Sequence, residues 1–304
     1  MKKIIAIAAA LLMTLNICAQ DLFVGSYNIR YVNDKDSIKG NVWTKRCQVI
    51  CDQLNFEQPD IFGTQECYIQ QIHDLEARLD GYQHIGVARE DGKEVGEHSA
   101  IFYKKDKLKL LRNGDFWLSE TPEKPSIGWD AACTRICSWG EFKDKKTRLK
   151  FFFFSLHMDH IGIVARREAA KLVVKKIREL AGEKSPVILT GDFNVDQSNE
   201  IYQIFTQSGI LKDCYKCTRL RFAENGTFNG FDSDLKSESR IDHIFVSPRF
   251  KVDRYGVLTN GYWTLSDFSQ SEQKSANAPQ EINFKKIDRR TPSDHYPIMA
   301  RIKW

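Results

Sequence analysis

Residues 186–194 read Pro-Val-Ile-Leu-Thr-Gly-Asp-Phe-Asn, a short apolar run that leads directly into a polar turn. The run Pro186–Thr190 has the length and composition of a buried β-strand. Asp192 and Asn194 follow it, at the junction of strand and loop where α/β proteins place many functional side chains. Alone, Gly-Asp-Phe-Asn is more typical of a turn in which Asp and Asn bond their own backbone. This stretch alone therefore does not distinguish a turn from a functional site, and the rest of the chain is needed to decide.

Similar polar side chains stand at the ends of other expected strands. The pattern of apolar residues predicts further strands at 22–31, 60–64, 82–87, 99–103, 108–118, 132–142, 149–157, 241–247, 250–258 and 296–303. It predicts helices at 43–56, 69–79, 164–181 and 199–207. The side chains at these strand ends are Asn28, Glu66, His157, Asp242, Asp294 and His295. If the sheets pack face to face, we expect these ends to converge on one rim.

The order of the expected elements indicates a single α/β domain. Strands and helices are interspersed throughout, no linker divides the chain, and no internal repeat is visible. Several strands are consecutive, and the charged turn Lys143–Lys146 between two of them is a hairpin signal. We therefore expect mixed sheets with many antiparallel pairs, covered by helices. The segment Asn260–Arg290 is polar, with a low-complexity run at Ser266–Gln280, and we expect a loop there.

The side chains at the strand ends have the chemistry of a metal site. Carboxylate and amide oxygens suit Mg²⁺ or Mn²⁺, and two imidazoles accompany them. The pair Cys214-x-x-Cys217 has no partner pair at zinc spacing, so a zinc site is only weakly supported. Cys47 and Cys51 lie on one face of an expected helix and read as small buried hydrophobic residues. Disulfide pairing among the seven cysteines after Cys18 stays open.

Six motifs, taken in order, closely resemble those of the endonuclease/exonuclease/phosphatase superfamily. They are Ser26-Tyr27-Asn28, Thr64-Gln65-Glu66, Leu156-His157-Met158-Asp159-His160, Gly191-Asp192-Phe193-Asn194, Arg240-Ile241-Asp242-His243 and Ser293-Asp294-His295. The resemblance implies the DNase I-like fold, a four-layer α/β sandwich. Two mixed, mostly antiparallel sheets would pack face to face with helices outside and the site at one rim. Residues 126–139 resemble a stretch found in a bacterial exported branch of uncertain substrate.

The resemblance also implies a role for each residue. The counterparts of the family's metal ligands for Mg²⁺ or Mn²⁺ are Asn28, Glu66 and Asp294. The counterparts of its catalytic groups are His157, Asp192, Asn194, Asp242 and His295. Among these, Asp192 looks like the group that activates or orients water, and Asn194 like the one that holds a phosphate oxygen. The implied activity is divalent-metal-dependent hydrolysis of a phosphoester by in-line attack of water, on a monoester or a diester.

Three further side chains near the motifs are candidate substrate contacts. Arg30 stands where some DNA-repair relatives carry an acidic residue, which speaks against a metal shell of the repair type. Arg30 would contact a substrate phosphate or lie on the surface as a solvated arginine. Arg135 and His160 are candidates for the rim, and a paired structural arginine is the alternative for Arg135. His243 follows Asp242 directly, so on a strand it points to the opposite face and reads as structural.

The N-terminus has the features of a secretory signal peptide. Lys2 and Lys3 form a positive region, and Ile4–Leu15 is an apolar run that is short for a membrane span. We expect cleavage after residue 20, which leaves residues 21–304 as one domain exported to the periplasm or beyond. Lipid attachment through Cys18 is disfavoured because the bulky Ile17 precedes it. No later segment is long and apolar enough for a transmembrane anchor.

Charge and composition restrict the partners only weakly. The formal net charge of +5 falls to +3 without Lys2 and Lys3, so nucleic acid is neither required nor excluded. We expect a monomer acting on a phosphoester. The fold does not choose among a secreted nuclease, a sugar or nucleotide phosphatase, and a sphingomyelinase or inositol-phosphate phosphatase. The alternatives outside catalysis are a binding module that kept the fold and an interaction protein that uses residues 266–280.

Overall fold

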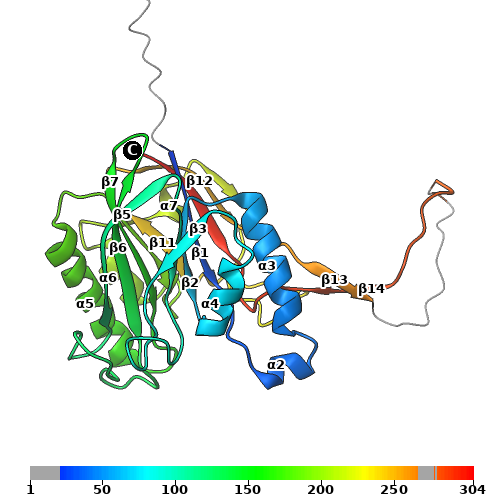
Figure 1. The fold of residues 1–304 in the computed structure, drawn as a ribbon, viewed down its shortest axis with the longest axis horizontal. Coiled ribbons are helices and arrows are strands. Elements are labelled where there is room, and N and C mark those ends of the chain that lie inside the picture. The colour runs from blue at the N-terminus through cyan, green and yellow to red at the C-terminus, as the bar shows by residue number, and fades with distance from the viewer. Residues whose placement is uncertain (1–20, 266–276, 278) are drawn as a thin grey trace, which may run out of the picture.

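The computed structural model describes residues 21–265, 277 and 279–304. Two large β-sheets pack face to face and helices cover their outer faces (Figure 1). This is the DNase I-like sandwich that the sequence predicts. The expected signal peptide, residues 1–20, lies outside the described residues, as does most of the low-complexity run.

Each sheet mixes parallel and antiparallel pairs, as predicted. The first sheet has the order β10 (Leu220–Phe222), β12 (Lys251–Val257), β15 (Ile298–Lys303), β1 (Asp21–Asn28), β2 (Ile61–Gln65), β4 (Ile101–Lys104) and β3 (Tyr82–Ile85). The second has the order β5 (Leu108–Trp117), β6 (Ile136–Asp144), β7 (Lys150–His157), β8 (Val187–Asp192), β11 (Asp242–Val246) and β9 (Lys212–Asp213). The parallel pairs are β1–β2, β7–β8 and β10–β12.

Strand β7 shows why the sheets form layers. It carries a phenylalanine run, and all of its residues after Lys150 are buried. Phe151 and Phe153 pack between the two sheets, whereas Phe152 and Phe154 face the helices outside. A strand covered on both faces reads as a continuous apolar run rather than an alternating one. The burial of these rings fixes β7, and with it the position of His157 at its end.

The helices complete the outer layers. Helices α5 (Ile163–Ala181) and α6 (Glu200–Thr206) cover the second sheet, and α3 (Trp43–Glu57) and α4 (Ile69–Glu76) cover the first. These four match the predicted helices to within a few residues. The short helices α2 (Asp34–Ile38) and α7 (Cys214–Cys217) were not predicted. In the described part of the chain, no helix combines the length and the hydropathy of a membrane span.

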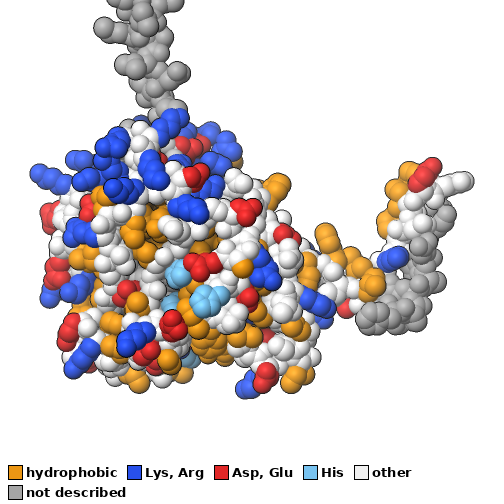
Figure 2. All heavy atoms as spheres, viewed as in Figure 1, with side chains coloured by type: hydrophobic (Ala, Val, Ile, Leu, Met, Phe, Trp, Pro, Cys, Tyr) orange, Lys and Arg blue, Asp and Glu red, His pale blue; other side chains and the backbone are white. Residues whose placement is uncertain are grey.

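The segment expected as a polar loop contains a two-stranded ribbon instead. Strands β13 (Tyr262–Leu265) and β14 (Ile287–Arg290) pair antiparallel and project from the body (Figure 1). Hydrophobic side chains lie along this ribbon (Figure 2), and Trp263 is 65% exposed. The run Tyr-Trp-Thr-Leu is rich in residues that favour strands. The overall polarity of residues 260–290 concealed this short signal.

The cysteines after residue 20 form no disulfide bonds. All seven cysteines after residue 20 are free, and Cys47 and Cys51 are buried on one face of α3, as expected. Their sulfur atoms lie 4.0 Å apart. The fold is therefore held by its apolar layers in the part that the structure describes.

Candidate active site

The strand register brings the predicted side chains together. On β7, β8 and β11, the residues paired side by side at the same end are His157, Asp192 and Asp242. On the facing sheet, β1 ends at Asn28, next to the end of β2 that precedes Glu66. The two sheets pack face to face, so these ends meet at one rim.

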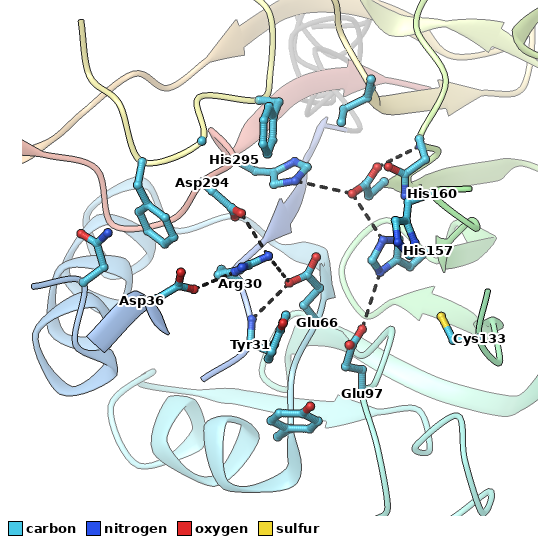
Figure 3. A pocket seen from close by; sticks show the side chains of 18 of the residues that line it. Arg30, Tyr31, Asp36, Glu66, Glu97, Cys133, His157, His160, Asp294 and His295 are labelled. Carbon is cyan, nitrogen blue, oxygen red and sulfur yellow. Dashed lines mark hydrogen bonds and ion pairs between the residues drawn. The ribbon is translucent and has the colours of Figure 1, made fainter. Parts of the chain in front are cut away.

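A pocket of about 850 Å³ opens at this rim (Figure 3). Its lining includes nine of the eleven side chains predicted for the site: Arg30, Glu66, Arg135, His157, His160, Asp192, Asn194, Asp294 and His295. Asn28 and Asp242 lie directly behind it, where they hydrogen-bond lining residues. All eleven are thus brought to one place.

Asp192 lies at the centre of the polar network. Its Oδ2 accepts a hydrogen bond from Asn28 Nδ2 at 3.0 Å and faces two imidazole nitrogens, His157 Nε2 at 3.5 Å and His295 Nε2 at 3.6 Å. The other carboxylate oxygen accepts from the backbone N–H of Asn194 at 2.9 Å. Burial and the neighbouring Asp242 together raise the pKa of Asp192 to about 7. A carboxylate with such a pKa is a stronger base than an exposed one.

His295 and Asp242 form an imidazole–carboxylate pair. His295 Nδ1 lies 2.9 Å from Asp242 Oδ2, which fixes the ring and turns Nε2 toward Asp192. Burial alone would lower the pKa of His295, but the carboxylates of Asp242 and Asp192 outweigh it and raise the pKa well above 6.5. The two carboxylates therefore favour the charged form of this buried ring. The ring of Phe228 lies edge-on to it, with centroids 5.1 Å apart.

His157 has the opposite electrostatic setting. Burial lowers its pKa well below 6.5, and the positive charges of Arg135 and Arg89 lower it further. Its Nδ1 atom is buried without a hydrogen bond, and Glu97 Oε2 lies 3.8 Å away. Glu97 was not predicted from the sequence. It sits inside the loop before β4 rather than at a strand end, so the criterion that found the other carboxylates could not find it.

Glu97 is a half-buried carboxylate that lines the pocket wall behind His157 (Figure 3). Arg89 Nη1 donates to its Oε2 at 2.7 Å. Burial raises the pKa of Glu97 to about 7, although Arg89 opposes this. The carboxylate lies 3.8 Å from the Nδ1 atom of His157, which has no hydrogen bond in the part of the chain that the structure describes.

Asn28 orients the neighbouring carboxylates. Its Nδ2 donates to Glu66 Oε1 and to Asp192 Oδ2, each at 3.0 Å. Its Oδ1 accepts from the backbone N–H of Arg30 at 3.0 Å, which fixes the amide in this direction. The structure therefore shows Asn28 as a donor to the carboxylates, and its predicted role as a metal ligand stays a prediction.

Glu66 and Asp294, the other predicted metal ligands, share one cationic neighbour. Arg30 Nη1 lies 3.4 Å from Asp294 Oδ2 and 3.9 Å from Glu66 Oε2 (Figure 3). Burial raises the pKa of Asp294, and the nearby Glu66 raises it further, against the effects of His295 and Arg30. Two neighbouring carboxylates, of which Asp294 is buried, form a site for a further positive charge.

Strained backbone marks the pocket. Four of its lining residues have a positive φ without being glycine: Arg30 at 59°, Glu66 at 63°, Asn194 at 50° and Phe231 at 64°. Each such residue costs on the order of 1 kcal/mol and persists where its surroundings hold it. Here the strain places one arginine, one carboxylate, one amide and one ring in the same pocket.

The remaining candidates divide between the pocket wall and the core. Arg135 is buried, with Nε 3.3 Å from Asp159 and Nη2 2.9 Å from His160 Nδ1. Arg135 and His160 therefore form a paired group on the wall. His243 lies on the opposite face of β11, buried, with Nε2 2.9 Å from the carbonyl oxygen of Val195. It belongs to the core, as the alternation along the strand predicts.

The loop between β10 and β11 supplies part of the pocket lining. Phe228, which is 47% exposed, and Phe231 come from this loop. Asn229 ties the loop to the segment before β15, because its backbone N–H donates to the carbonyl oxygen of Asp294 at 2.7 Å and its Nδ2 to that of Ser293 at 3.1 Å. These aromatic residues were missed because no polar motif marks them.

Face-to-face mixed sheets with carboxylates, amides and imidazoles at one rim define a DNase I-like protein. The chain matches the model of the Endonuclease/Exonuclease/phosphatase family over residues 25–295, and it belongs to that family, whose members are phosphoester hydrolases.

Two solved structures and one curated protein illustrate the relationship. A mannosyl-6-phosphatase of Bacteroides thetaiotaomicron VPI-5482 is 50% identical, with a TM-score of 0.84 over 93% of this chain and 100% of that one. A family protein from Bacteroides vulgatus is 35% identical, with a TM-score of 0.78 over 93% and 98%. An uncharacterized protein of Acanthamoeba polyphaga mimivirus is 27% identical over 84% of this chain and 91% of its own length.

Proposed function

We propose that this protein is a divalent-metal-dependent phosphomonoesterase that acts on a sugar phosphate. The observation that carries the proposal is the buried Asp192, which faces two imidazoles of opposite electrostatic setting at the base of a pocket. The likeness to a mannosyl-6-phosphatase at 50% identity favours a hexose 6-phosphate within this class.

The side chains fit Mg²⁺ or Mn²⁺. Glu66 and Asp294 would hold the ion with hard oxygen ligands, and no thiolate lies among them. Burial and a neighbouring carboxylate raise the pKa values of Asp192 and Asp294, so a further positive charge would stabilise their ionised forms. A bound divalent ion would offset the charge of the phosphoryl group and stabilise the transition state.

The protein's own residues account for the remaining chemistry. Asp192 is placed to hold the attacking water and accept its proton, because its pKa lies near neutrality. His295, whose charged form the neighbouring carboxylates favour, is placed to donate from Nε2 to a phosphoryl oxygen, while Asp242 fixes its ring. Asn194 donates through Nδ2 to the carbonyl oxygen of Met158 at 2.9 Å, which leaves its second amide N–H for the substrate.

The pocket suits a compact substrate with a cyclic leaving group. A volume of about 850 Å³ accommodates a hexose phosphate. Phe228 presents an exposed ring directly beside His295. Aromatic rings commonly pack against the apolar faces of sugars, so this ring supports a leaving group that is a pyranose.

A nuclease is the weaker candidate because three of the four basic side chains that line the pocket, Arg30, Arg89 and Arg135, are ion-paired, and other basic side chains lie far from it. Exposed basic side chains gather in the turns that flank the far ends of the strands: Lys105, Lys145, Lys146, Arg148 and Lys150 (Figure 2). Strand β7 begins at Lys150 and reaches the pocket at His157, so about 23 Å separate the two ends. A nuclease would place its phosphate contacts beside the site.

Three further expectations remain proposals. We propose export with removal of residues 1–20, a monomeric state and a phosphoester as the partner, with nucleic acid possible but not indicated by the net charge. The non-catalytic binding module stays as an alternative, although the ligand and imidazole side chains are all present and brought together.

Hydrolysis of a substrate panel tests the proposed function. The purified chain would be freed of metal with a chelator, supplied with Mg²⁺ or Mn²⁺, and offered mannose 6-phosphate, a phosphodiester, DNA and sphingomyelin. We expect release of phosphate from mannose 6-phosphate only with metal present. Turnover of DNA alone would favour the nuclease, and no turnover with either ion would favour the binding module.

A further inference from the structure

Arg30 is held in the pocket by an unusual set of contacts. Its backbone has a φ of 59°, in the left-handed region that arginine rarely adopts. Its N–H donates to Asn28 Oδ1 at 3.0 Å, and its carbonyl oxygen accepts from Arg46 Nη2 at 3.1 Å and from Gln71 Nε2 at 3.0 Å. The backbone N–H and carbonyl groups of Arg30 are both hydrogen-bonded, so the backbone conformation is held despite the strain and the side chain is directed into the pocket.

The guanidinium group lies among the predicted metal ligands. Nη1 faces Asp294 Oδ2 at 3.4 Å and Glu66 Oε2 at 3.9 Å. In the described part of the chain, Arg30 is the only lysine or arginine within ion-pair distance of either carboxylate. It therefore occupies the electrostatic position that a metal ion would take.

Asp36 gives Arg30 a second partner outside the ligand group. Arg30 Nε donates to Asp36 Oδ2 at 2.8 Å (Figure 3). Asn33 Nδ2 donates to the same oxygen at 2.6 Å. Asp36 is buried in the short helix α2, where Asn33 also caps its backbone N–H. Arg30 thus has one partner, Asp36, that lies outside the predicted metal ligands. Its other two partners, Glu66 and Asp294, would coordinate a bound metal ion.

We propose that Arg30 is the resident counter-ion of the metal site. It balances Glu66 and Asp294 in the metal-free protein, and it gives up these carboxylates but keeps Asp36 when a divalent ion binds. From that position its Nη atoms face the pocket and the substrate phosphate. The inference rests on the proposed metal dependence and adds a specific property, which is competition between an internal cation and the metal.

The competition has a consequence that a purely structural arginine would not have. Because Arg30 shares the ligands, its removal should strengthen metal binding while it weakens phosphate binding. The two effects have opposite signs. By contrast, simple damage to the site would weaken both.

Calorimetric titration with Mn²⁺ tests the proposal on the purified chain. We expect Arg30→Met to bind Mn²⁺ about tenfold more tightly than the natural protein, because a positive charge beside the ligands is removed. Arg30→Lys should stay within about threefold, because it keeps the charge. Asp36→Asn should weaken Mn²⁺ binding, because the arginine then has only the ligand carboxylates as charged partners.

Arg135→Met is the matched control, since it removes a positive charge from the same pocket but not from the ligands. We expect its Mn²⁺ affinity to change by less than about threefold. The KM for the phosphoester should rise in Arg30→Met, while the Mn²⁺ concentration for half-maximal activity falls. If thermal melting shows that Arg30→Met does not fold, the Mn²⁺ affinities of Asp36→Asn and Arg30→Lys are compared with that of the natural protein instead.

Unchanged or weaker Mn²⁺ binding in Arg30→Met would overturn the inference and leave the proposed function standing. Equal tightening in Arg135→Met would also overturn it, because the effect would then be that of net charge. Absence of Mn²⁺ and Mg²⁺ binding in the natural protein would overturn both proposals together.

Discussion

The Nε2 atoms of His157 and His295 lie 3.5 and 3.6 Å from the same oxygen of Asp192. The two rings differ in charge because their other neighbours differ. Carboxylates surround His295 and raise its pKa, whereas burial and two arginines lower that of His157. One carboxylate thus stands between an imidazole whose charged form is favoured and an imidazole whose neutral form is favoured. Pairs of titratable groups with separated pKa values are a frequent sign of acid–base catalysis.

Replacement of Asp192 should abolish hydrolysis and keep the fold. We expect Asp192→Asn to lower kcat by about 10³-fold, because the amide cannot accept a proton from water. The melting temperature should stay close to that of the natural protein, because the amide keeps the volume and removes a buried charge. Phosphate release and thermal melting are the two measurements. Activity within tenfold of the natural protein would remove Asp192 from the mechanism.

Glu97 should matter through His157. We expect Glu97→Gln to lower kcat by about tenfold, since it removes the negative charge that faces Nδ1 of that ring. Glu94→Gln, an exposed neighbour in the same loop, serves as the control and should leave kcat unchanged. An equal effect of the two substitutions would contradict a role for Glu97.

Phe228 should determine affinity for the leaving group. We expect Phe228→Ala to raise the KM for mannose 6-phosphate by about five- to tenfold, which corresponds to about 1 kcal/mol of lost ring contact. The KM for a small ester without a ring, such as glycerol phosphate, should hardly change. Phe222→Ala, which removes an exposed ring outside the pocket, is the control. A uniform loss for both esters would indicate a structural role for Phe228.

Acid should destabilise the protein through His243. Burial lowers the pKa of this histidine from 6.5 to about 4 in the folded state. Below pH 6.5, His243 is therefore protonated in the unfolded chain but stays neutral in the folded chain. The free energy of unfolding falls as the pH drops from 6.5 to 4. Over this pH range the free energy of unfolding decreases by about 3 kcal/mol.

Urea unfolding across this pH range measures the effect. His243→Asn should have a flatter dependence of the unfolding free energy on pH, although it is less stable at neutral pH. His73→Asn, an exposed position on α4, should keep the slope of the natural protein. Equal slopes for all three proteins would count against the buried neutral histidine.

The fold and most of the site could be predicted because polar side chains stand at the ends of apolar strands, where the sequence pattern reveals them. Asn28, Glu66, His157, Asp192 and Asp242 all follow or open strongly apolar strands. Strand length and order then place them at a common rim. Boundaries such as that of α5 followed from apolar periodicity, which is a property of neighbouring residues.

The remaining features depend on contacts between distant segments. Glu97 and Phe228 sit in loops whose courses are set by residues elsewhere, so no local pattern reveals them. The direction of the Asn28 amide depends on the backbone of Arg30, and the pairing of Arg30 with Asp294 joins residues 264 positions apart in sequence. The strands β13 and β14 were missed because their partners are separated by a polar stretch.

The contacts of Asn229 bear on how such enzymes diversify. Asn229, next to Phe228, donates hydrogen bonds to the carbonyl oxygens of Ser293 and Asp294, so the loop proposed to contact the leaving group and the segment that carries a predicted metal ligand are held together. A loop transplanted from a relative would shift Asp294 unless the segment 291–295 came with it. Substrate preference in this lineage should therefore change by substitution of exposed side chains on a conserved loop backbone, and exchange of whole loops should be rare.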